Sequence, residues 1–169
     1  MKTVVLGVLS LLTLGPLSAT ADDSLAKFRG GIGVIPVSSA PGTATTAPDV
    51  NRNIVRGVQP AGQIWVIRDL KADVKTDGSI KVDGRGLLLG GGNNIGFNAN
   101  ARVLATLLCE TAPNTFIERS TNVLGVPLEE NGDFEIDDVL SNPPTACARP
   151  VLLIRNAANL GWFAAGIPE

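Results

Sequence analysis

The first candidate group of functional residues is an acidic segment. Positions 129–138 hold six carboxylates and no basic residue. Dense oxygen ligands of this kind can bind calcium, although the spacing differs from the D-x-D-x-D-G pattern of an EF-hand loop. The alternative is a solvated hairpin face, because alternating acids commonly point into water. The candidate calcium ligands are Glu129, Asp133, Asp137 and Asp138.

Three arginines form a second candidate group, because each directly follows a short apolar run. They are Arg56, Arg68 and Arg155. If the ends of these runs converge, the three guanidinium groups would form a pocket for a carboxylate or a sulfate. The alternative is that each arginine lies along apolar surface with its charged head in water, or pairs with an acid.

Composition excludes several classes of activity. The chain has 169 residues with no His and only two Cys, so it can form neither a Ser-His-Asp triad nor a His-ligated zinc site. A formal net charge of -2 gives no electrostatic footprint for nucleic acid. Carboxylate pairs are the remaining acid–base option, with Glu110 and Glu118 among those available. The sequence therefore indicates no catalytic residue, no cofactor and no nucleic-acid partner.

The N-terminus is typical of a secretory signal peptide. Lys2 precedes the apolar run 4–14, and Ala19 and Ala21 supply the small residues of a cleavage site. The run is shorter than the ~20 residues needed to span a bilayer. We expect cleavage after residue 21, a secreted, periplasmic or extracellular product, and no integral membrane segment after cleavage. An oxidising compartment in turn predicts a disulfide between Cys109 and Cys147.

We expect β-strands to hold the candidate acids, arginines and cysteines in position. No segment has a sustained helical period, and Gly and Pro, 19 and 11 in number, separate short runs rich in β-forming residues. The sequence predicts one all-β domain, an antiparallel β-sandwich of about eight or nine short strands, with a closed β-barrel as the alternative. In this division, residues 1–21 are the signal, 22–52 a strand and a Pro/Thr/Ala-rich loop of the same domain, and 53–169 the core. The expected strands are 30–37, 53–58, 63–75, 79–89, 101–110, 121–128, 133–139, 151–156 and 162–167.

The sharpest local prediction is a hairpin with the three-residue loop 76–78. Alternation places Val74 opposite Ile80 and Ala72 opposite Val82, with Gly78 in a left-handed conformation. On the other face the register brings opposite charges together at 73/81, 71/83 and 69/85. The same device predicts a second hairpin around the turn 130–132, with Leu128 opposite Phe134 and Val126 opposite Ile136.

Two further features favour structural roles. The glycine-rich run 90–96 lacks the G-K-[ST] of a phosphate loop, so we expect a loop or a bulge there. Trp65 and Trp162 sit in apolar surroundings and are expected in the core. In architecture, residues 53–168 resemble many small secreted β-sandwich modules. We expect a secreted, non-catalytic binding or cell-envelope-associated module; the alternatives are a small carboxylate-dependent hydrolase and a calcium-dependent carbohydrate-binding module.

Overall fold

The structure is a computed structural model that describes residues 23–35, 37–38, 50–51 and 53–169. The proposed signal peptide and most of the Pro/Thr/Ala-rich loop lie outside these residues. The described part contains strands and no helix. The strands are β1 (Ser24–Gly33), β2 (Val37–Ser38), β3 (Val50–Asn51), β4 (Trp65–Val66), β5 (Asp69–Lys75), β6 (Ser79–Arg85), β7 (Leu88–Leu89), β8 (Arg102–Ala112), β9 (Thr115–Ser120), β10 (Val126–Pro127), β11 (Phe134–Val139), β12 (Ala148–Asn156) and β13 (Trp162–Pro168).

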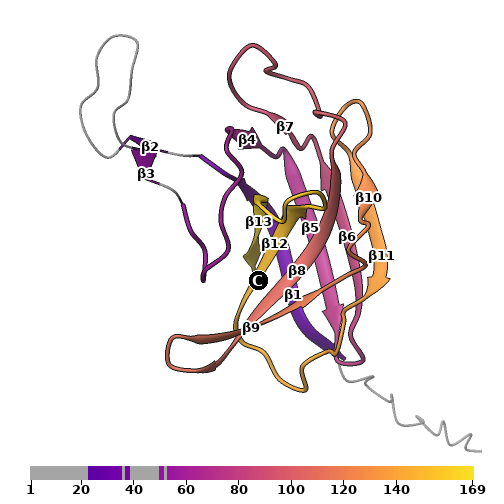
Figure 1. Cartoon of the computed structure of the whole chain (residues 1–169). Coiled ribbons are helices and arrows are strands. Elements are labelled where there is room, and N and C mark those ends of the chain that lie inside the picture. The colour runs from indigo at the N-terminus through magenta and orange to yellow at the C-terminus, as the bar shows by residue number, and fades with distance from the viewer. Residues whose placement is uncertain (1–22, 36, 39–49, 52) are drawn as a thin grey trace, which may run out of the picture.

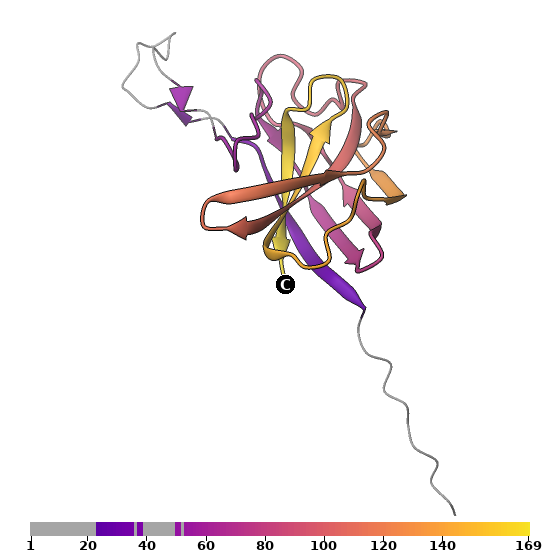
Figure 2. The same cartoon turned by 60° about the horizontal axis from the view of Figure 1, so that its bottom comes forward.

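Nine of these strands form one antiparallel sheet that curls into a half-barrel (Figure 1). Its order is β10-β8-β12-β13-β1-β5-β6-β11, and β9 pairs with β8 outside this path. The β8–β9 pair extends beyond the curled sheet as a long hairpin (Figure 2). A short second sheet, β4 with β7, lies near one end of the half-barrel. The predicted all-β, antiparallel fold is confirmed, and its sandwich-like layering comes largely from the curvature of one sheet.

The N-terminal strand is a central part of this sheet. β1 pairs with β13 on one side and with β5 on the other. It begins at Ser24, earlier than the predicted strand 30–37, because buried Ala26 and Phe28 alternate with charged neighbours and fit the period of a strand. The described part of the N-terminal region therefore contributes directly to the core.

The apolar strands β8 and β12 are buried on both faces over residues 103–109 and 152–155. Segment 53–60 covers part of the outer face, where the indole nitrogen of Trp162 donates a hydrogen bond to the Asn53 carbonyl at 2.9 Å. The strand predicted at 53–58 is instead a turn closed by Val55 and Val58. Its apolar residues are used for covering the sheet and form no continuous ladder with it.

The β5–β6 hairpin has the predicted register, with Val74 opposite Ile80 and Ala72 opposite Val82. Gly78 has a φ of +89°, the left-handed conformation that a three-residue loop requires. A feature that the sequence did not reveal is the approach of Pro143, whose Cβ lies 2.5 Å from where a Cβ on Gly78 would be. Two independent constraints therefore select glycine at this turn.

The charges on this hairpin pair differently from the prediction. Positions 73/81, 71/83 and 69/85 are register partners, yet none of these pairs forms an ion pair among the described residues. Lys81 instead contacts Asp137 on β11 at 3.1 Å, and Arg85 contacts Asp83 two residues away at 2.9 Å. For Lys81 the reason is that β6 has β11 as a second neighbouring strand, whose acids compete for its side chain.

The second predicted hairpin is correct only at its turn. The Glu129 amide donates to the Asp133 carbonyl at 2.9 Å, which closes the loop. Beyond the turn, Val126 pairs with Val103 of β8, and Phe134 pairs with Gly84 of β6. The two arms separate because each completes a different edge of the curled sheet.

The predicted disulfide joins Cys109 to Cys147, with their Cα atoms 4.8 Å apart. Cys109 is fully buried on β8, and Cys147 directly precedes β12. The bridge therefore links the segment leading into β12 to the adjacent strand β8.

Candidate functional site

A large cavity lies at one end of the half-barrel and is called here the mouth pocket. Its volume is about 640 Å³, within the range of roughly 300–1,000 Å³ typical of small-molecule sites. Its sixteen lining residues are Ala61, Gly62, Gln63, Trp65, Leu89, Ala99, Asn100, Ala101, Arg102, Val123, Leu124, Asn156, Ala157, Ala158, Asn159 and Phe163. They come from four separate parts of the chain, so the folded sheet is needed to assemble the pocket.

The segments that surround the mouth pocket are almost free of charge. Residues 59–67, 86–101, 120–128 and 156–168 contain no Asp, Glu, Lys or Arg. Arg102, at the start of β8, is the one ionisable residue in the pocket lining. The lining also contains no Ser, Thr or Cys that could act as a nucleophile.

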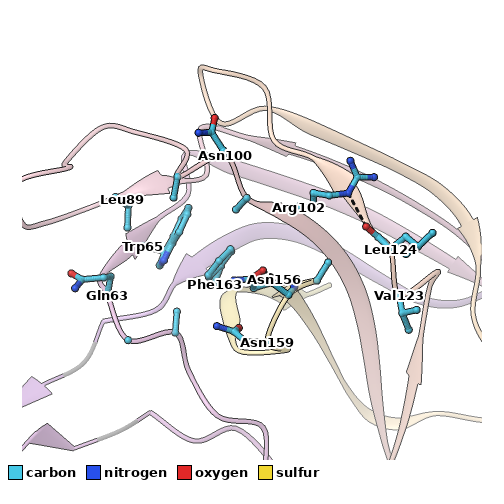
Figure 3. Close-up of a pocket in the computed structure, with 16 residues that line it drawn as sticks. Gln63, Trp65, Leu89, Asn100, Arg102, Val123, Leu124, Asn156, Asn159 and Phe163 are labelled. Carbon is cyan, nitrogen blue, oxygen red and sulfur yellow. Dashed lines mark hydrogen bonds between the residues drawn. The ribbon is translucent and has the colours of Figure 1, made fainter.

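Two aromatic rings form the floor of the mouth pocket (Figure 3). Trp65 and Phe163 stack with their centroids 3.9 Å apart and their planes inclined by 19°. Both residues are only 3% exposed, which confirms the prediction that Trp65 belongs to the core. By contrast, Val123 and Leu124 on the rim are 65% and 70% exposed. An apolar surface therefore continues from the buried floor to the outside.

The β12–β13 loop supplies hydrogen-bond donors to the wall of the pocket. The side-chain oxygen of Asn156 accepts from the Ala158 amide at 2.9 Å, and that of Asn159 accepts from the Gly161 amide at 3.0 Å. These bonds fix both carboxamides, because only the oxygen can accept from a backbone N–H. Neither Nδ2 group has a partner among the described residues, so both amides keep donors available to a ligand.

Arg102, whose backbone carbonyl accepts a hydrogen bond from the Ala157 amide at 2.9 Å, holds the neighbouring rim in place. Its Nε donates to the Leu124 carbonyl at 2.8 Å (Figure 3), and its Nη2 donates to the Gly125 carbonyl. The guanidinium has no acid partner among the described residues, and Nη1 donates to none of their atoms. The side chain thus fixes the rim loop 121–125 and retains both a positive charge and a free donor.

Three of the seven non-glycine residues with a positive φ among the described residues lie in or next to this pocket. Ala99 and Asn100 have φ values of +54° and +49°, and Leu160 has +60°. A residue with a Cβ pays a cost for this conformation, and such costs are often found at binding sites.

The four candidate calcium ligands do not come together. Within the residues that the structure describes, no group of three or more His, Cys, Asp or Glu side chains could hold a metal ion. Glu129 is exposed beside the β10–β11 turn, and Asp137 pairs with Lys81. The carboxylate of Asp138 accepts hydrogen bonds from the amides of Asn122 and Val139, each at 2.8 Å.

Asp133 is the most constrained of the four. Its carboxylate accepts from the Gly86 amide at 2.9 Å and lies near the guanidinium groups of Arg85 and Arg68, at 3.4 and 3.6 Å. The Gly86 hydrogen bond, helped by the two arginines against the opposing effect of burial, lowers the pKa of Asp133. A candidate calcium ligand and a candidate anion-binding arginine therefore meet each other.

The three arginines also remain apart. Arg56 donates to the Leu108 carbonyl at 3.0 Å and lies over the Phe116 ring, and burial lowers its pKa. Arg155 is 8% exposed and binds Glu118 at 2.8 Å and the Leu160 carbonyl at 2.7 Å. With Arg68 on Asp133, each group has its own local partner, so the three do not form a shared pocket.

The carboxylates considered for acid–base chemistry are each paired with an arginine. Glu118 binds Arg155, and Glu110 binds Arg149. Burial acts to raise the pKa of Glu110, but hydrogen bonds from Arg149 and from the Asn114 amide outweigh it and lower this pKa. Glu110 is thereby held in its ionised form.

Sequence reasoning missed the polar residues of the mouth pocket, chiefly Asn100, Arg102, Asn156 and Asn159. A search for acids, cysteines and basic clusters overlooks carboxamides. The available signal was the length of the charge-free segments, above all 86–101 and 156–168, in a chain in which 18% of residues are charged.

No family model matches this chain, and neither a curated protein nor a solved structure is similar to it. Function is therefore inferred from the pocket itself. In the described residues, no helix is long and apolar enough to cross a membrane.

Proposed function

We propose that this protein is a secreted, non-catalytic binding protein that takes a small, mostly apolar molecule with a hydrogen-bonding group in the mouth pocket. The observation that carries the proposal is the pocket's make-up. Ten of its sixteen residues are apolar, and its polar groups are carboxamides and one arginine. Ligand pockets commonly combine an apolar lining with a few fixed polar groups.

The same make-up supports binding over catalysis. A hydrolase needs a nucleophile or a pair of acids beside the bond that breaks. The mouth pocket is lined by no Asp, Glu, Ser, Thr, Cys or Lys. The carboxylates of Glu110 and Glu118 lie outside it and are each neutralised by an arginine.

Binding in this pocket can be tested with Nile red, a neutral dye that becomes bright in apolar surroundings. We expect saturable binding of one dye per chain. Ala158→Trp places a large ring in the pocket and should weaken dye binding by about tenfold or more. A loss of affinity of this size is comparable to the loss of one favourable contact. Ala146→Trp is the matched control, because Ala146 is exposed and lies outside the pocket lining.

Two results would reject the proposal. One is dye binding that does not saturate at one site. The other is equal binding by the two tryptophan variants, which would place the dye elsewhere.

Export is the second part of the proposal. The signal-like N-terminus and the Cys109–Cys147 disulfide support it, since disulfides persist in oxidising compartments. Sequencing the N-terminus of exported protein should read Asp-Asp-Ser-Leu, from residue 22. An intact Met1 on folded cytoplasmic protein would contradict export.

A further inference from the structure

Three polar side chains of the mouth pocket, Asn156, Asn159 and Arg102, point to a ligand class, beside the further carboxamides Gln63 and Asn100 of the lining. Asn156 and Asn159 have their side-chain oxygens committed to the Ala158 and Gly161 amides. What they offer a ligand is therefore N–H. Arg102 adds a free N–H and a positive charge, with no acid in the lining to neutralise it.

A ligand that fits must supply acceptors to these donors. Hydrogen bonds from Arg to a carboxylate are stronger than bonds between neutral groups. A single cation matches a single negative charge, whereas a phosphate dianion would leave one charge unpaired in this largely apolar pocket. The stacked floor of Trp65 and Phe163 and the rim residues Val123 and Leu124 provide the apolar surface for the rest of the molecule.

We propose that the mouth pocket binds a monocarboxylate with an apolar body, its carboxylate held by Arg102. This proposal rests on the proposed function and adds the chemistry of the head group. In this proposal, β8 and the β12–β13 loop form the polar side of the pocket. The aromatic floor and the rim loop 121–125 form its apolar side.

Three probes with the same eight-carbon chain separate the head groups. They are octanoate, octanamide and octylamine, titrated into the oxidised protein by calorimetry. We expect octanoate to bind about tenfold more tightly than octanamide, the difference between a charge-assisted and a neutral hydrogen bond. Octylamine should bind most weakly, because its cation faces Arg102.

The ratio of the octanoate affinity to the octanamide affinity is the decisive quantity, because a general loosening of the rim would lower both affinities. Arg102→Gln should bring this ratio close to one, and Arg102→Lys should keep most of it because the charge remains. Arg29→Gln is the control: Arg29 is an exposed arginine that pairs with Glu169 outside the pocket. It should leave the ratio unchanged.

Asn159→Asp tests the donor wall without removing the local turn. A carboxylate there can still accept from the Gly161 amide, but it replaces the free N–H by a negative charge. We expect octanoate to lose affinity while octanamide changes little.

The outcomes separate the two proposals. Equal binding of octanoate and octanamide, both lost in Ala158→Trp, would overturn the carboxylate assignment and leave the binding function standing. An affinity ratio that survives Arg102→Gln would also overturn the assignment. If neither the probes nor Nile red binds in the pocket, both proposals fail.

Discussion

The mouth pocket and the outer face of β5, β6 and β11 use polar residues in opposite ways. On the outer face most polar groups are charged, and many satisfy one another, as Lys81 does with Asp137 and Arg85 with Asp83. In the pocket the polar groups are mostly uncharged, and several keep a donor unused. A densely charged surface can therefore satisfy its own polar groups through ion pairs, whereas a nearly uncharged surface can keep hydrogen-bond donors free for a ligand.

The comparison also explains why the charged residues were poor guides to function. Exposed ion pairs contribute little energy, but they consume the groups that could bind ions. Asp133 shows this most clearly, because Gly86, Arg85 and Arg68 already surround its carboxylate. The acids and arginines that looked most capable of chemistry in the sequence are the ones most fully used by the fold.

The largest effect is expected from the disulfide, which holds together the framework common to both regions. Closing a 38-residue loop stabilises a fold by ~4 kcal/mol in the chain-entropy model. The double variant Cys109→Ala/Cys147→Ala should lose a comparable free energy of unfolding, measured by urea denaturation. A loss below about 1 kcal/mol would show that β8 and β12 hold this region without the bridge.

The next largest effect on stability is expected at the turn of the β5–β6 hairpin. Gly57 serves there as the matched control for Gly78. Gly78 and Gly57 both have a φ of +89°, but a Cβ meets Pro143 at Gly78 and nothing within 4 Å at Gly57. Each change to Ala should cost ~1 kcal/mol for the conformation, and Gly78→Ala should cost clearly more because of the collision. Denaturation midpoints compare the two variants. Equal losses would mean that the Pro143 contact relaxes freely.

Acidification should lower the free energy of unfolding, in part through protonation of Asp133. The folded state lowers its pKa below the unfolded value near ~3.9, so its contribution is present above that pH and is lost as pH falls through the folded pKa. Asp133→Asn should therefore show a smaller loss of stability between neutral pH and about pH 2 than the parent protein. Urea midpoints across this range measure it. Parallel pH curves for the two proteins would contradict this role.

The smallest effect is expected from reversing one exposed charge of the outer face. Lys71 forms no ion pair within the described residues and lies in the exposed row of β5. Lys71→Glu should change the free energy of unfolding by less than about 0.5 kcal/mol, as measured by thermal or urea unfolding. A loss above about 1 kcal/mol would show that the outer face depends on its charges more than this account allows.

Sequence reasoning succeeded where a single period or a single chemical rule dominates. Alternation fixed the register of Val74 with Ile80, and the export signal led to the pairing of Cys109 with Cys147. It failed where several segments compete. Val126 lies beside β8 because the curled sheet offers it an edge that no local pattern encodes. The assembly of the pocket was not predicted for the same reason, since Arg102, Leu124 and Asn156 meet only when three distant segments share one end of the sheet.

The most direct test of the central claim is an amide chemical-shift titration of the oxidised protein with octanoate. We expect shifts confined to the mouth pocket, at residues 61–63, 99–102, 123–124 and 156–159, and none on the outer face of β5, β6 and β11. Shifts centred on that charged face, or none at all up to millimolar octanoate, would contradict it.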